Sequence, residues 1–311
     1  MNLRMKVPLD LAMNDAYEIE RLHPFNVRQY AGMTFPAYRR VLLQDVGSER
    51  VIACVAKRDG KGVGLALVED VGGLGPTLRS VYADPTHRKC GVATQLLAAA
   101  ESLSAEHGWT SLRTVFMEGP GNRTDLRRLL ARRDWTDPVL RTHVIRIALD
   151  QIFRSSWMQR RRPLPDNFEI FPWTDLSDLE KEALLRDQKE HNWPDIEVSP
   201  FHYGPHFEEN TSFGVRFEGK VVGWVVNHRY DEETLRFTCS YLREDLQKLG
   251  RLVELYARSI DQMKNKTEFN QGIMTVPVEY PAMWAFARRH LVPFARDVQK
   301  TYGSTKELVS K

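Results

Sequence analysis

One short stretch of the sequence has the residue types and spacing that would hold a diphosphate. It runs from His87 to Thr94 and contains the pattern Arg-x-x-Gly-x-Ala between an expected strand and an expected helix. The start of a helix offers unpaired amide groups and a partial positive charge to an anion. Gly91 lets the backbone approach closely, Ala93 keeps the first turn uncluttered, and Arg88 and Lys89 add charge. The alternative is a basic surface turn that caps a helix.

The residues around this turn predict alternating strands and helices. Apolar residues at helical spacing, from Val92 to Leu103, indicate an amphipathic helix that Gly108 ends. β-Branched and aromatic runs on either side indicate strands. The expected order is a hairpin, a strand, a helix, a strand, a helix and a strand, at residues 51–57, 63–71, 78–83, 92–108, 112–117, 124–133 and 141–149. This order implies a mixed α/β fold with a central, partly parallel sheet.

An internal repeat divides the chain. Four segments recur in the same order with offsets of 151, 159, 157 and 156 residues: Tyr17-Glu18-Ile19 with Phe168-Glu169-Ile170, Gly60-Lys61-x-Val63-Gly64 with Gly219-Lys220-x-Val222-Gly223, Thr77-Leu78-Arg79 with Thr234-Leu235-Arg236, and Ala131-Arg132-Arg133 with Ala287-Arg288-Arg289. A repeated order of elements indicates a duplicated fold even when most side chains differ. The sequence therefore predicts two tandem domains of the same architecture.

The predicted boundaries follow from length and composition. A chain of 311 residues exceeds what one hydrophobic core usually supports. The stretch RSSWMQRRRPLPD, with its basic cluster and two prolines, is typical of a linker. We expect a first domain at residues 1–150, a linker at residues 151–166 and a second domain at residues 167–311.

Bulk composition is ordinary for a soluble globular protein. No apolar run approaches the roughly 20 residues of a membrane span, and the N-terminus lacks a long apolar signal, so we expect a cytoplasmic protein. The three cysteines are far apart and suit a reducing compartment. A net charge of +3 is too small to indicate nucleic-acid binding. His202 and His206 have Gly204-Pro205 between them, which argues against a helical metal pair, and no metal is expected.

The segment SVYADPTHRKCGVATQLL resembles motif A of the GNAT acyltransferase superfamily. In that motif a strand, a proline and an Arg/Gln-x-x-Gly-x-Gly/Ala turn precede the helix that binds pyrophosphate. The resemblance covers nearly all of residues 15–150 and implies that the chain is two tandem GNAT folds with acetyl-CoA or a longer acyl-CoA as cosubstrate. It also implies that the strand main chain holds the pantetheine arm and that the turn holds the pyrophosphate. The implied cosubstrate-binding residues are Val81, Tyr82, Ala83, Arg88, Lys89, Cys90, Gly91, Val92, Ala93 and Thr94.

Catalytic side chains are harder to assign. Acylation of an amine requires a base, donors to the oxyanion and a proton for the departing thiolate. Compared with the family pattern, Ser80 stands where a glutamate base often lies, and Leu130 stands where a thiolate-protonating tyrosine often lies. We take Glu118 as the candidate base and Tyr82 as a candidate hydroxyl donor, with Ser80 in the usual base position. A solvated loop carboxylate and a core tyrosine are the alternatives.

The second half departs from the pattern. Its corresponding stretch, Gln247 to Leu252, keeps a glutamine and a glycine but ends on bulky Leu252, and Glu244 and Asp245 add negative charge nearby. We expect a degenerate CoA cleft in a domain that serves as scaffold and acceptor site, with His228, Asp231 and Glu232 as further candidates. Core packing is the default for its aromatic residues, and a peptide groove or acyl tunnel is the alternative: Trp193, Phe201, Tyr203, Phe207, Trp224, Trp284 and Phe286.

The leading functional hypothesis is a CoA-dependent N-acyltransferase. It would transfer an acetyl or longer acyl group to a primary amine, including a lysine- or ornithine-type side chain of a biosynthetic peptide. One alternative is an acetyltransferase of a small amine metabolite. Another, from a different class, is a non-catalytic acyl-CoA sensor or scaffold, which would explain the absence of the usual glutamate and tyrosine.

Overall fold

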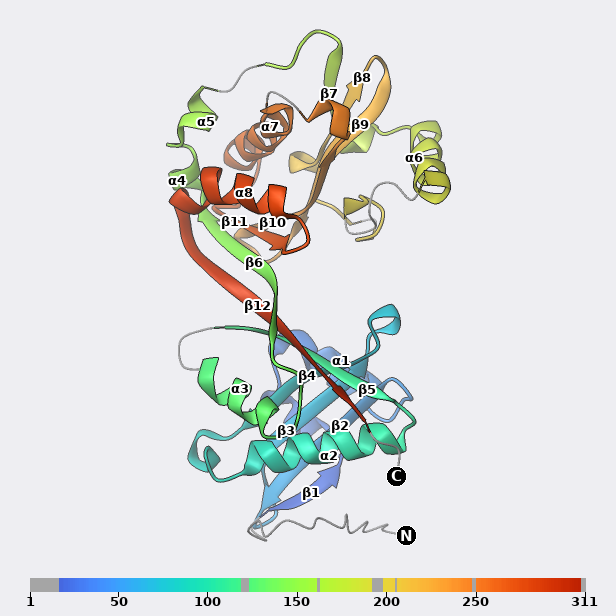
Figure 1. Ribbon diagram of the computed structural model, residues 1–311, viewed down its shortest axis with the longest axis vertical. Helices are drawn as coiled ribbons and strands as arrows, with labels where there is room; N and C mark the ends of the chain where they lie inside the picture. The colour runs from blue at the N-terminus through green and yellow to red at the C-terminus, as the bar shows by residue number, and fades with distance from the viewer. Residues whose placement is uncertain are drawn as a thin grey trace. The chain divides into compact units, whose positions relative to one another are not determined.

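The computed structural model describes residues 17–118, 123–160, 163–191, 198–204, 206–247 and 250–308 (Figure 1). It has the mixed α/β fold that the sequence predicts. The chain divides into two compact units, which are described separately. Unit 1 comprises Met1–Leu140 and Tyr302–Lys311, and unit 2 comprises Arg141–Thr301.

Unit 1 is a sheet with helices on both faces. The strand order is β1-β2-β3-β4-β5, followed by the second half of β12. All pairs from β1 to β4 are antiparallel, and β4 and β5 are parallel. Its elements are β1 (Glu18–Arg21), η1 (Arg28–Met33), η2 (Pro36–Tyr38), α1 (Arg39–Asp45), β2 (Val51–Arg58), β3 (Lys61–Asp70), η3 (Gly72–Leu74), β4 (Pro76–Ala83), η4 (Pro85–His87), α2 (Val92–Glu106), β5 (Ser111–Met117) and α3 (Arg123–Ala131).

Alternate residues of β2 and β3 feed two cores on opposite faces of this sheet. On one face Ile52, Cys54 and Ala66 pack with α2 and α3. On the other face Val51 and Leu65 pack with η1 and α1, among other residues. The period of two is that of a sheet covered on both sides, which explains why β2 and β3 are almost continuously apolar. Figure 1 shows α2 lying across the strands.

Gly64 permits the close packing of α2 against β3. A Cβ at this position would lie 2.8 Å from side-chain atoms of Val92 and Leu96 and 2.7 Å from the Tyr82 carbonyl oxygen. In unit 2 a Cβ at Gly223 would lie 2.6 Å from the Tyr241 carbonyl oxygen. Both positions therefore require glycine, which gives a physical reason for this part of the sequence repeat.

Unit 2 repeats the order of elements. Its strand order is β6-β11-β10-β9-β8-β7, with β10 and β11 parallel. The elements are β6 (Val139–Ala148), α4 (Leu149–Ile152), α5 (Ser156–Gln159), β7 (Phe168–Pro172), η5 (Trp173–Asp175), α6 (Asp178–His191), η7 (Glu209–Thr211), β8 (Phe213–Phe217), β9 (Lys220–Arg229), β10 (Thr234–Leu242), η8 (Glu244–Leu246), α7 (Arg251–Lys266), β11 (Gln271–Pro277), α8 (Pro281–His290), η10 (Val292–Phe294) and β12 (Ala295–Glu307).

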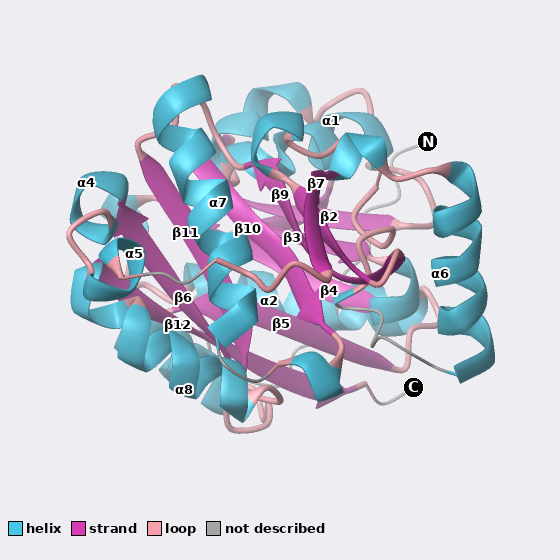
Figure 2. Ribbon diagram, turned by 90° about the horizontal axis from the view of Figure 1, so that it is seen from above, coloured by secondary structure: helices cyan, strands magenta, loops and turns pink. Residues whose placement is uncertain are grey.

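Two cores again lie on the two faces of the sheet in unit 2. Val225 belongs to the core that α7 and α8 cover, whereas Trp224 and Val226 belong to the core beside α6. Helices α7 and α6 lie on opposite faces of β7, β8 and β9 (Figures 1 and 2). The described aromatic residues singled out above all pack in or against these cores, so core packing is the correct interpretation: Phe201, Tyr203, Phe207, Trp224, Trp284 and Phe286. Trp193 lies outside the described residues.

The two hairpins that begin the repeat have the same turn. Asp59 and Gly60 have φ of 51° and 74°, and Glu218 and Gly219 have φ of 51° and 76°. Two successive positive φ values are typical of the turn that fits the twist of a tight hairpin. The later match of Thr77-Leu78-Arg79 with Thr234-Leu235-Arg236 is wrong by two residues. Strand register pairs Leu67 with Ser80 and Val226 with Cys239, which gives β4 and β10 the same 159-residue offset as the hairpin.

The last strand returns to unit 1. β12 begins in unit 2, and its residues from Tyr302 onward lie in unit 1. There the Thr136 amide donates to the Thr305 carbonyl (2.9 Å) and the Leu308 amide donates to the Thr110 carbonyl (2.8 Å). Lys306 also contacts Glu101, which is 5% exposed (Nζ–Oε2 3.1 Å). The N-terminal unit thus takes its final strand from the far end of the chain.

The predicted boundaries therefore need correction. Residues 141–150 belong to unit 2 and residues 302–311 to unit 1, because β6 and β12 each run from one unit into the other. The expected linker at residues 151–166 is not a free connection, since it contains α4 and α5. Ile152 and Met158 lie in the core of unit 2, and the Trp157 indole donates to the His290 carbonyl (2.9 Å). Arg161 and Arg162 of the basic cluster lie outside the described residues.

Candidate functional site

The predicted diphosphate turn joins β4 to α2 in unit 1. Gly91 precedes the 15-residue helix α2 with φ of 86°, and no side chain caps the helix. Lys89 also has a positive φ, 62°, which is uncommon for a residue other than glycine. Strain of this kind is often found where backbone groups are aimed at a ligand. The uncapped amides at the start of α2 are therefore available to an anion.

Charged side chains surround this turn. Arg88, Lys89 and Cys90 are exposed, and the Arg88 Nε lies 3.4 Å from the Ala83 carbonyl oxygen. Asp84 accepts hydrogen bonds from the hydroxyl and the amide of Thr86, which hold its pKa below the ordinary value. The charge of Asp84 is thus satisfied locally, while the two cations are not paired with a carboxylate in the described part of the chain.

Strands β4 and β5 separate beside the turn. Their parallel ladder has two register pairs, Thr77 with Arg113 and Leu78 with Thr114. A β-bulge follows at once in β4, because Leu67 pairs with Ser80 whereas Val68 pairs with Leu78, which leaves Arg79 as the extra residue. Beyond Leu78, no further pairing of β4 with β5 is found in the described residues. Backbone groups of β4 that point toward β5 are therefore open at this level.

The bulge divides the predicted residues of β4 between two faces. Val81 and Ala83 pack against the core on the α2 side. Ser80 and Tyr82 pair with Leu67 and Leu65, which point to the α1 side, and register partners share a face. The Ser80 hydroxyl is buried and lies 2.7 Å from the Thr34 hydroxyl. Of the three proposed catalytic residues, Ser80 and Tyr82 thus face away from α2.

Glu118, the candidate base, lies just after β5 and binds α3. Its carboxylate accepts from Arg127 at 2.8–2.9 Å, and its side chain is 9% exposed. The Arg127 guanidinium lies 4.4 Å from the ring centroid of Tyr302, which in turn stacks on Phe116. Glu118 is therefore not a solvated loop carboxylate. Gly119, Pro120 and Gly121, which follow it, lie outside the described residues.

Sequence reasoning missed a charged pair beside the bulge. The Arg79 Nε donates to Glu69 Oε2 at 2.7 Å, and the two side chains are 25% and 11% exposed. The Arg79 guanidinium also lies 5.2 Å from the ring centroid of Tyr38. Glu69 near the end of β3, in a largely apolar strand, was the one sequence signal for this pair, since Glu in such a strand requires a partner.

The corresponding turn in unit 2 carries different side chains. Gly250 precedes α7 with φ of 71° and no side chain caps this helix, so the left-handed glycine and the uncapped start are both retained. However, Gln247 Nε2 donates to the Leu242 carbonyl (2.8 Å), and Arg251 Nη1 donates to the Leu246 carbonyl (3.2 Å). Leu252 packs against the core of unit 2. Lys248 and Leu249, the remaining residues of this turn, lie outside the described part.

The bulge is also retained in unit 2, with different chemistry. There Thr238 is the extra residue of β10, and its hydroxyl lies 2.8 Å from His228 Nδ1. By strand register His228 corresponds to Glu69 and Thr238 to Arg79. Burial, reinforced by Arg236, lowers the pKa of His228. A neutral pair thus replaces the ionic pair of unit 1.

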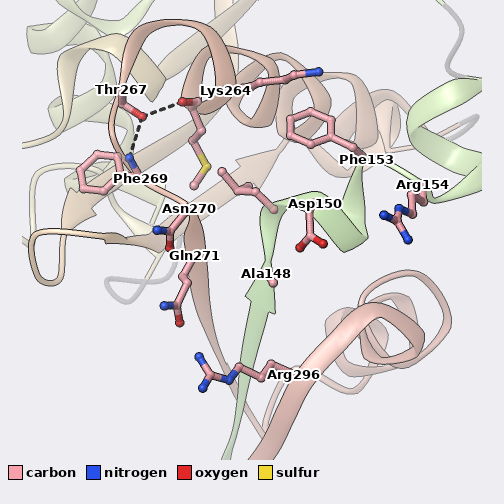
Figure 3. Close-up of a pocket in the computed structure, with 12 residues that line it drawn as sticks. Ala148, Asp150, Phe153, Arg154, Lys264, Thr267, Phe269, Asn270, Gln271 and Arg296 are labelled. Carbon is pink, nitrogen blue, oxygen red and sulfur yellow. Dashed lines mark hydrogen bonds between the residues drawn. The ribbon is translucent and has the colours of Figure 1, made fainter.

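A pocket in unit 2 lies elsewhere. It has a volume of about 730 Å³ and is lined by Asp150, Arg154, Lys264 and Arg296, among other residues (Figure 3). Asn270 and Gln271, where β11 begins, also line it. Because β10 and β11 are parallel, this is the sheet edge opposite the turn that leads into α7. The pocket is therefore not the counterpart of the diphosphate turn.

Metal-type clusters of side chains and membrane-spanning helices are not found among the described residues. Within the described ranges, no group of three histidine, cysteine or acidic side chains is placed to hold a metal ion. Of the helices that the structure describes, none has the length and hydropathy to cross a membrane.

Comparison with known proteins finds a likeness to a family for residues 15–125. These residues match the model of the acetyltransferase (GNAT) family. The match contains the diphosphate turn, the bulge and the Arg79–Glu69 pair. A comparison with curated protein sequences gives no match.

Solved structures extend the likeness to the whole chain. One is a tandem GNAT protein from the clavulanic acid biosynthesis pathway, with 14% identity, a TM-score of 0.65, and coverage of 95% of this chain and 99% of that one. Another is a GCN5-related N-acetyltransferase from Sphaerobacter thermophilus, with 14% identity, a TM-score of 0.54, and coverage of 95% and 97%. A third is a glucosamine N-acetyltransferase region of a fungal β-N-acetylglucosaminidase, with 13% identity, a TM-score of 0.62, and coverage of 93% and 38%.

At these identities the structural likeness defines the fold, and the family match adds the relationship in sequence. Both agree with the motif that surrounds Gly91 and with the duplicated order of elements in the two units. Residues 15–125 thus resemble the GNAT family in sequence, and the chain as a whole has the fold of a tandem GNAT structure.

Proposed function

We propose that this protein is a CoA-dependent N-acyltransferase whose unit 1 binds the acyl donor. Unit 2 serves as scaffold and helps to select the acceptor. The observation that carries the proposal is the uncapped start of α2 beside the opening between β4 and β5. The start of α2 would hold the phosphates, and the opening between β4 and β5 would leave room for the extended pantetheine arm.

The donor site follows from the chemistry of an acyl-CoA. Its pyrophosphate would accept from the amides between Lys89 and Thr94, with Arg88 and Lys89 adding charge. The pantetheine arm would pair with open backbone groups of Val81 to Ala83, much as a strand does. The thioester then lies at the bulge, where β4 and β5 have separated.

The reaction is attack of a neutral amine on the thioester carbonyl. Backbone amides of β4 beyond Leu78 would stabilise the oxyanion, because they are fixed in place before the reaction. The amine loses a proton and the CoA thiolate gains one as the carbon–sulfur bond breaks. We assign Glu118 as the candidate base, directly or through water, and the Tyr82 hydroxyl as a candidate proton donor. Ser80, held by Thr34, lines the site.

The acyl group is acetyl or longer, and the acceptor is a primary amine. A lysine- or ornithine-type side chain of a biosynthetic peptide is the leading acceptor, and a small amine metabolite is the alternative. The printed descriptions of similar structures include both a biosynthetic pathway protein and a glucosamine N-acetyltransferase region, so they support amine acylation without selecting one acceptor.

One observation favours a second function, an acyl-CoA sensor without catalysis. Leu130, which stands where the family often has a tyrosine, is fully buried, and Ser80 replaces the usual glutamate. A protein that only binds acyl-CoA needs neither group.

Thiol release separates the two functions. We expect CoA to be released when the protein is mixed with acyl-CoAs from acetyl to palmitoyl and a pool of primary amines. Native mass spectrometry of the purified protein would identify a copurified acyl-CoA and its chain length. Binding without release for every donor and amine would support the sensor and contradict the acyltransferase. A Glu118→Gln enzyme with full rate at every pH would remove Glu118 as the base.

A further inference from the structure

The geometry points to Arg79 as a residue that recognises a carboxylate on the acceptor. The acceptor class is then an amine that also bears a carboxylate, such as an amino acid or a peptide with a nearby carboxylate. This inference rests on the proposed function, since it concerns the same site.

The bulge sets the direction of Arg79. As the extra residue of β4, it lies between Leu78, the last residue paired with β5, and Ser80. A bulge re-aims a side chain that would otherwise follow the alternation of the strand. Arg79 and Ser80 contact residues of the η1–α1 region, Tyr38 and Thr34 respectively. The guanidinium is therefore aimed to the α1 side at the level where the strands separate.

Glu69 and Tyr38 hold the Arg79 guanidinium in place, and some of its N–H donors are left for a further acceptor. Glu69 accepts from Nε at 2.7 Å, and the Tyr38 ring supports the planar group at 5.2 Å. The two Nη atoms make no hydrogen bond within the part of the chain that is described, and neither is a buried atom. Because Glu69 takes the Nε, it fixes the orientation of the fork and leaves the Nη donors for another acceptor.

The α1 side is the side from which an acceptor would approach. On the opposite face, α2 and α3 cover the sheet, and the diphosphate turn occupies the end of β4. A thioester lying in the opening between β4 and β5 would face Ser80 and Tyr82 on the α1 side, where η1 and α1 also pack on the sheet and Ser80 is buried. A carboxylate on the acceptor could then bind the Arg79 guanidinium close to the carbonyl carbon of the thioester.

Arginine is suited to this task. Its planar fork matches a carboxylate with two parallel hydrogen bonds, and such charge-assisted bonds are among the stronger ones in proteins. The counterpart in unit 2 lacks this capacity, because Thr238 and His228 bond to each other and carry no permanent charge. The Arg79–Glu69 pair is therefore found in unit 1, which also contains the predicted diphosphate turn.

Matched acceptors test the inference. Lysine, lysinamide and cadaverine share a primary amine, but only lysine has a carboxylate. Ornithine and putrescine form a second pair. We expect thiol release to show a lower KM for the carboxylate-bearing member. Arg79→Gln should raise that KM by about 10- to 100-fold and change the KM of cadaverine by less than about 3-fold.

Two variants guard against a structural explanation. Arg79→Lys should recover part of the preference for lysine, since it retains the charge but not the fork. Arg39→Gln, which removes an exposed guanidinium from α1, should leave every KM unchanged. The Kd for acyl-CoA should be the same in all three variants.

Three outcomes would overturn the inference. Equal KM values for lysine and cadaverine in the wild type would overturn it and leave the acyltransferase intact. An equal loss with both acceptors in Arg79→Gln would show that Arg79 acts on folding or on the donor. No thiol release from wild-type protein with any amine would overturn the acyltransferase itself, and the inference with it.

Discussion

The turns that open α2 and α7 share a left-handed glycine and differ in their side chains. Each follows a bulged strand and passes through a left-handed glycine into a helix of 15 or 16 residues. In unit 1 Arg88 bonds to the Ala83 carbonyl, and Arg88 and Lys89 bring two positive charges to the turn. In unit 2 Gln247 and Arg251 bond to nearby carbonyls, and Leu252 joins the core. A duplicated fold can thus keep a helix start of the same form while the side chains around it change.

The cores beside the two turns also differ in their side chains. On the α7 side of unit 2, Tyr256 contacts Phe237 and stacks on Phe286, and the apolar cavity that remains measures about 20 Å³. The Tyr256 hydroxyl lies 2.5 Å from Ser240, and burial raises the pKa of Tyr256 to about 12. By the strand and helix offsets, Leu78 and Leu97 take the places of Phe237 and Tyr256 in unit 1. Aromatic packing therefore fills unit 2 where unit 1 has aliphatic residues.

The largest expected effect contrasts the two turns directly. Arg88→Glu combined with Gly91→Trp should weaken acyl-CoA binding by at least about 100-fold, through repulsion of the phosphates and obstruction of their approach. The matched variant, Gln247→Glu with Gly250→Trp, imposes similar strain at a left-handed glycine. It should leave the Kd within about 2-fold. Isothermal titration with acetyl-CoA measures both, and equal losses would contradict the assignment of the donor site to unit 1.

Acid should act on an ion pair of unit 2. Arg216 lowers the pKa of Glu180 from 4.5 to about 2 through hydrogen bonds, and the pair is partly exposed. The pair contributes stability above pH 4.5 that is lost as the pH falls toward 2. We expect Glu180→Gln to lower the free energy of unfolding by about 1–2 kcal/mol at pH 7, after allowance for solvent screening. The difference from wild type should vanish near pH 2, and a constant difference at all pH values would exclude this origin.

A smaller effect should follow from Tyr256→Phe. The change keeps the aromatic stack and removes the hydrogen bond with Ser240, which should cost about 0.5–1.5 kcal/mol of stability. Chemical denaturation measures the cost. Because Tyr256 belongs to unit 2, the Kd for acyl-CoA should not change, and a weakened Kd would show that unit 2 contributes to donor binding.

The smallest effect concerns Cys90. It is the exposed cysteine, whereas Cys54 and Cys239 are buried with pKa values raised to about 12 by burial. Maleimide should therefore label Cys90 first, and acyl-CoA should slow the labelling several-fold. Cys90→Ser should change the Kd by less than about 2-fold, because the proposed contact is through the backbone. Labelling at the same rate with and without acyl-CoA would contradict the placement of the phosphates.

Local patterns predicted much of the fold and the position of the turn that precedes α2, whose binding of a diphosphate stays a prediction. The strands, α2, α3 and the hairpin turn at Gly60 follow from residues that are close in sequence, and so does the left-handed position at Gly91. The Arg79 bulge could not be found in this way, since strand pairing decides it. For the same reason Thr34 was not identified as the partner of Ser80, which is 46 residues away. The roles of Glu118, Tyr82 and Ser80 stay predictions.

The return of β12 has a consequence for biosynthesis. Thr305, Lys306 and Leu308 supply hydrogen bonds to residues 101–136, yet they leave the ribosome about 170 residues after that region. During translation the N-terminal half therefore has an open sheet edge until the rest of the chain has been made. A chain that stops early would therefore lack a finished first half, and nascent-chain protease protection of residues 17–118 should appear only after β12 has emerged.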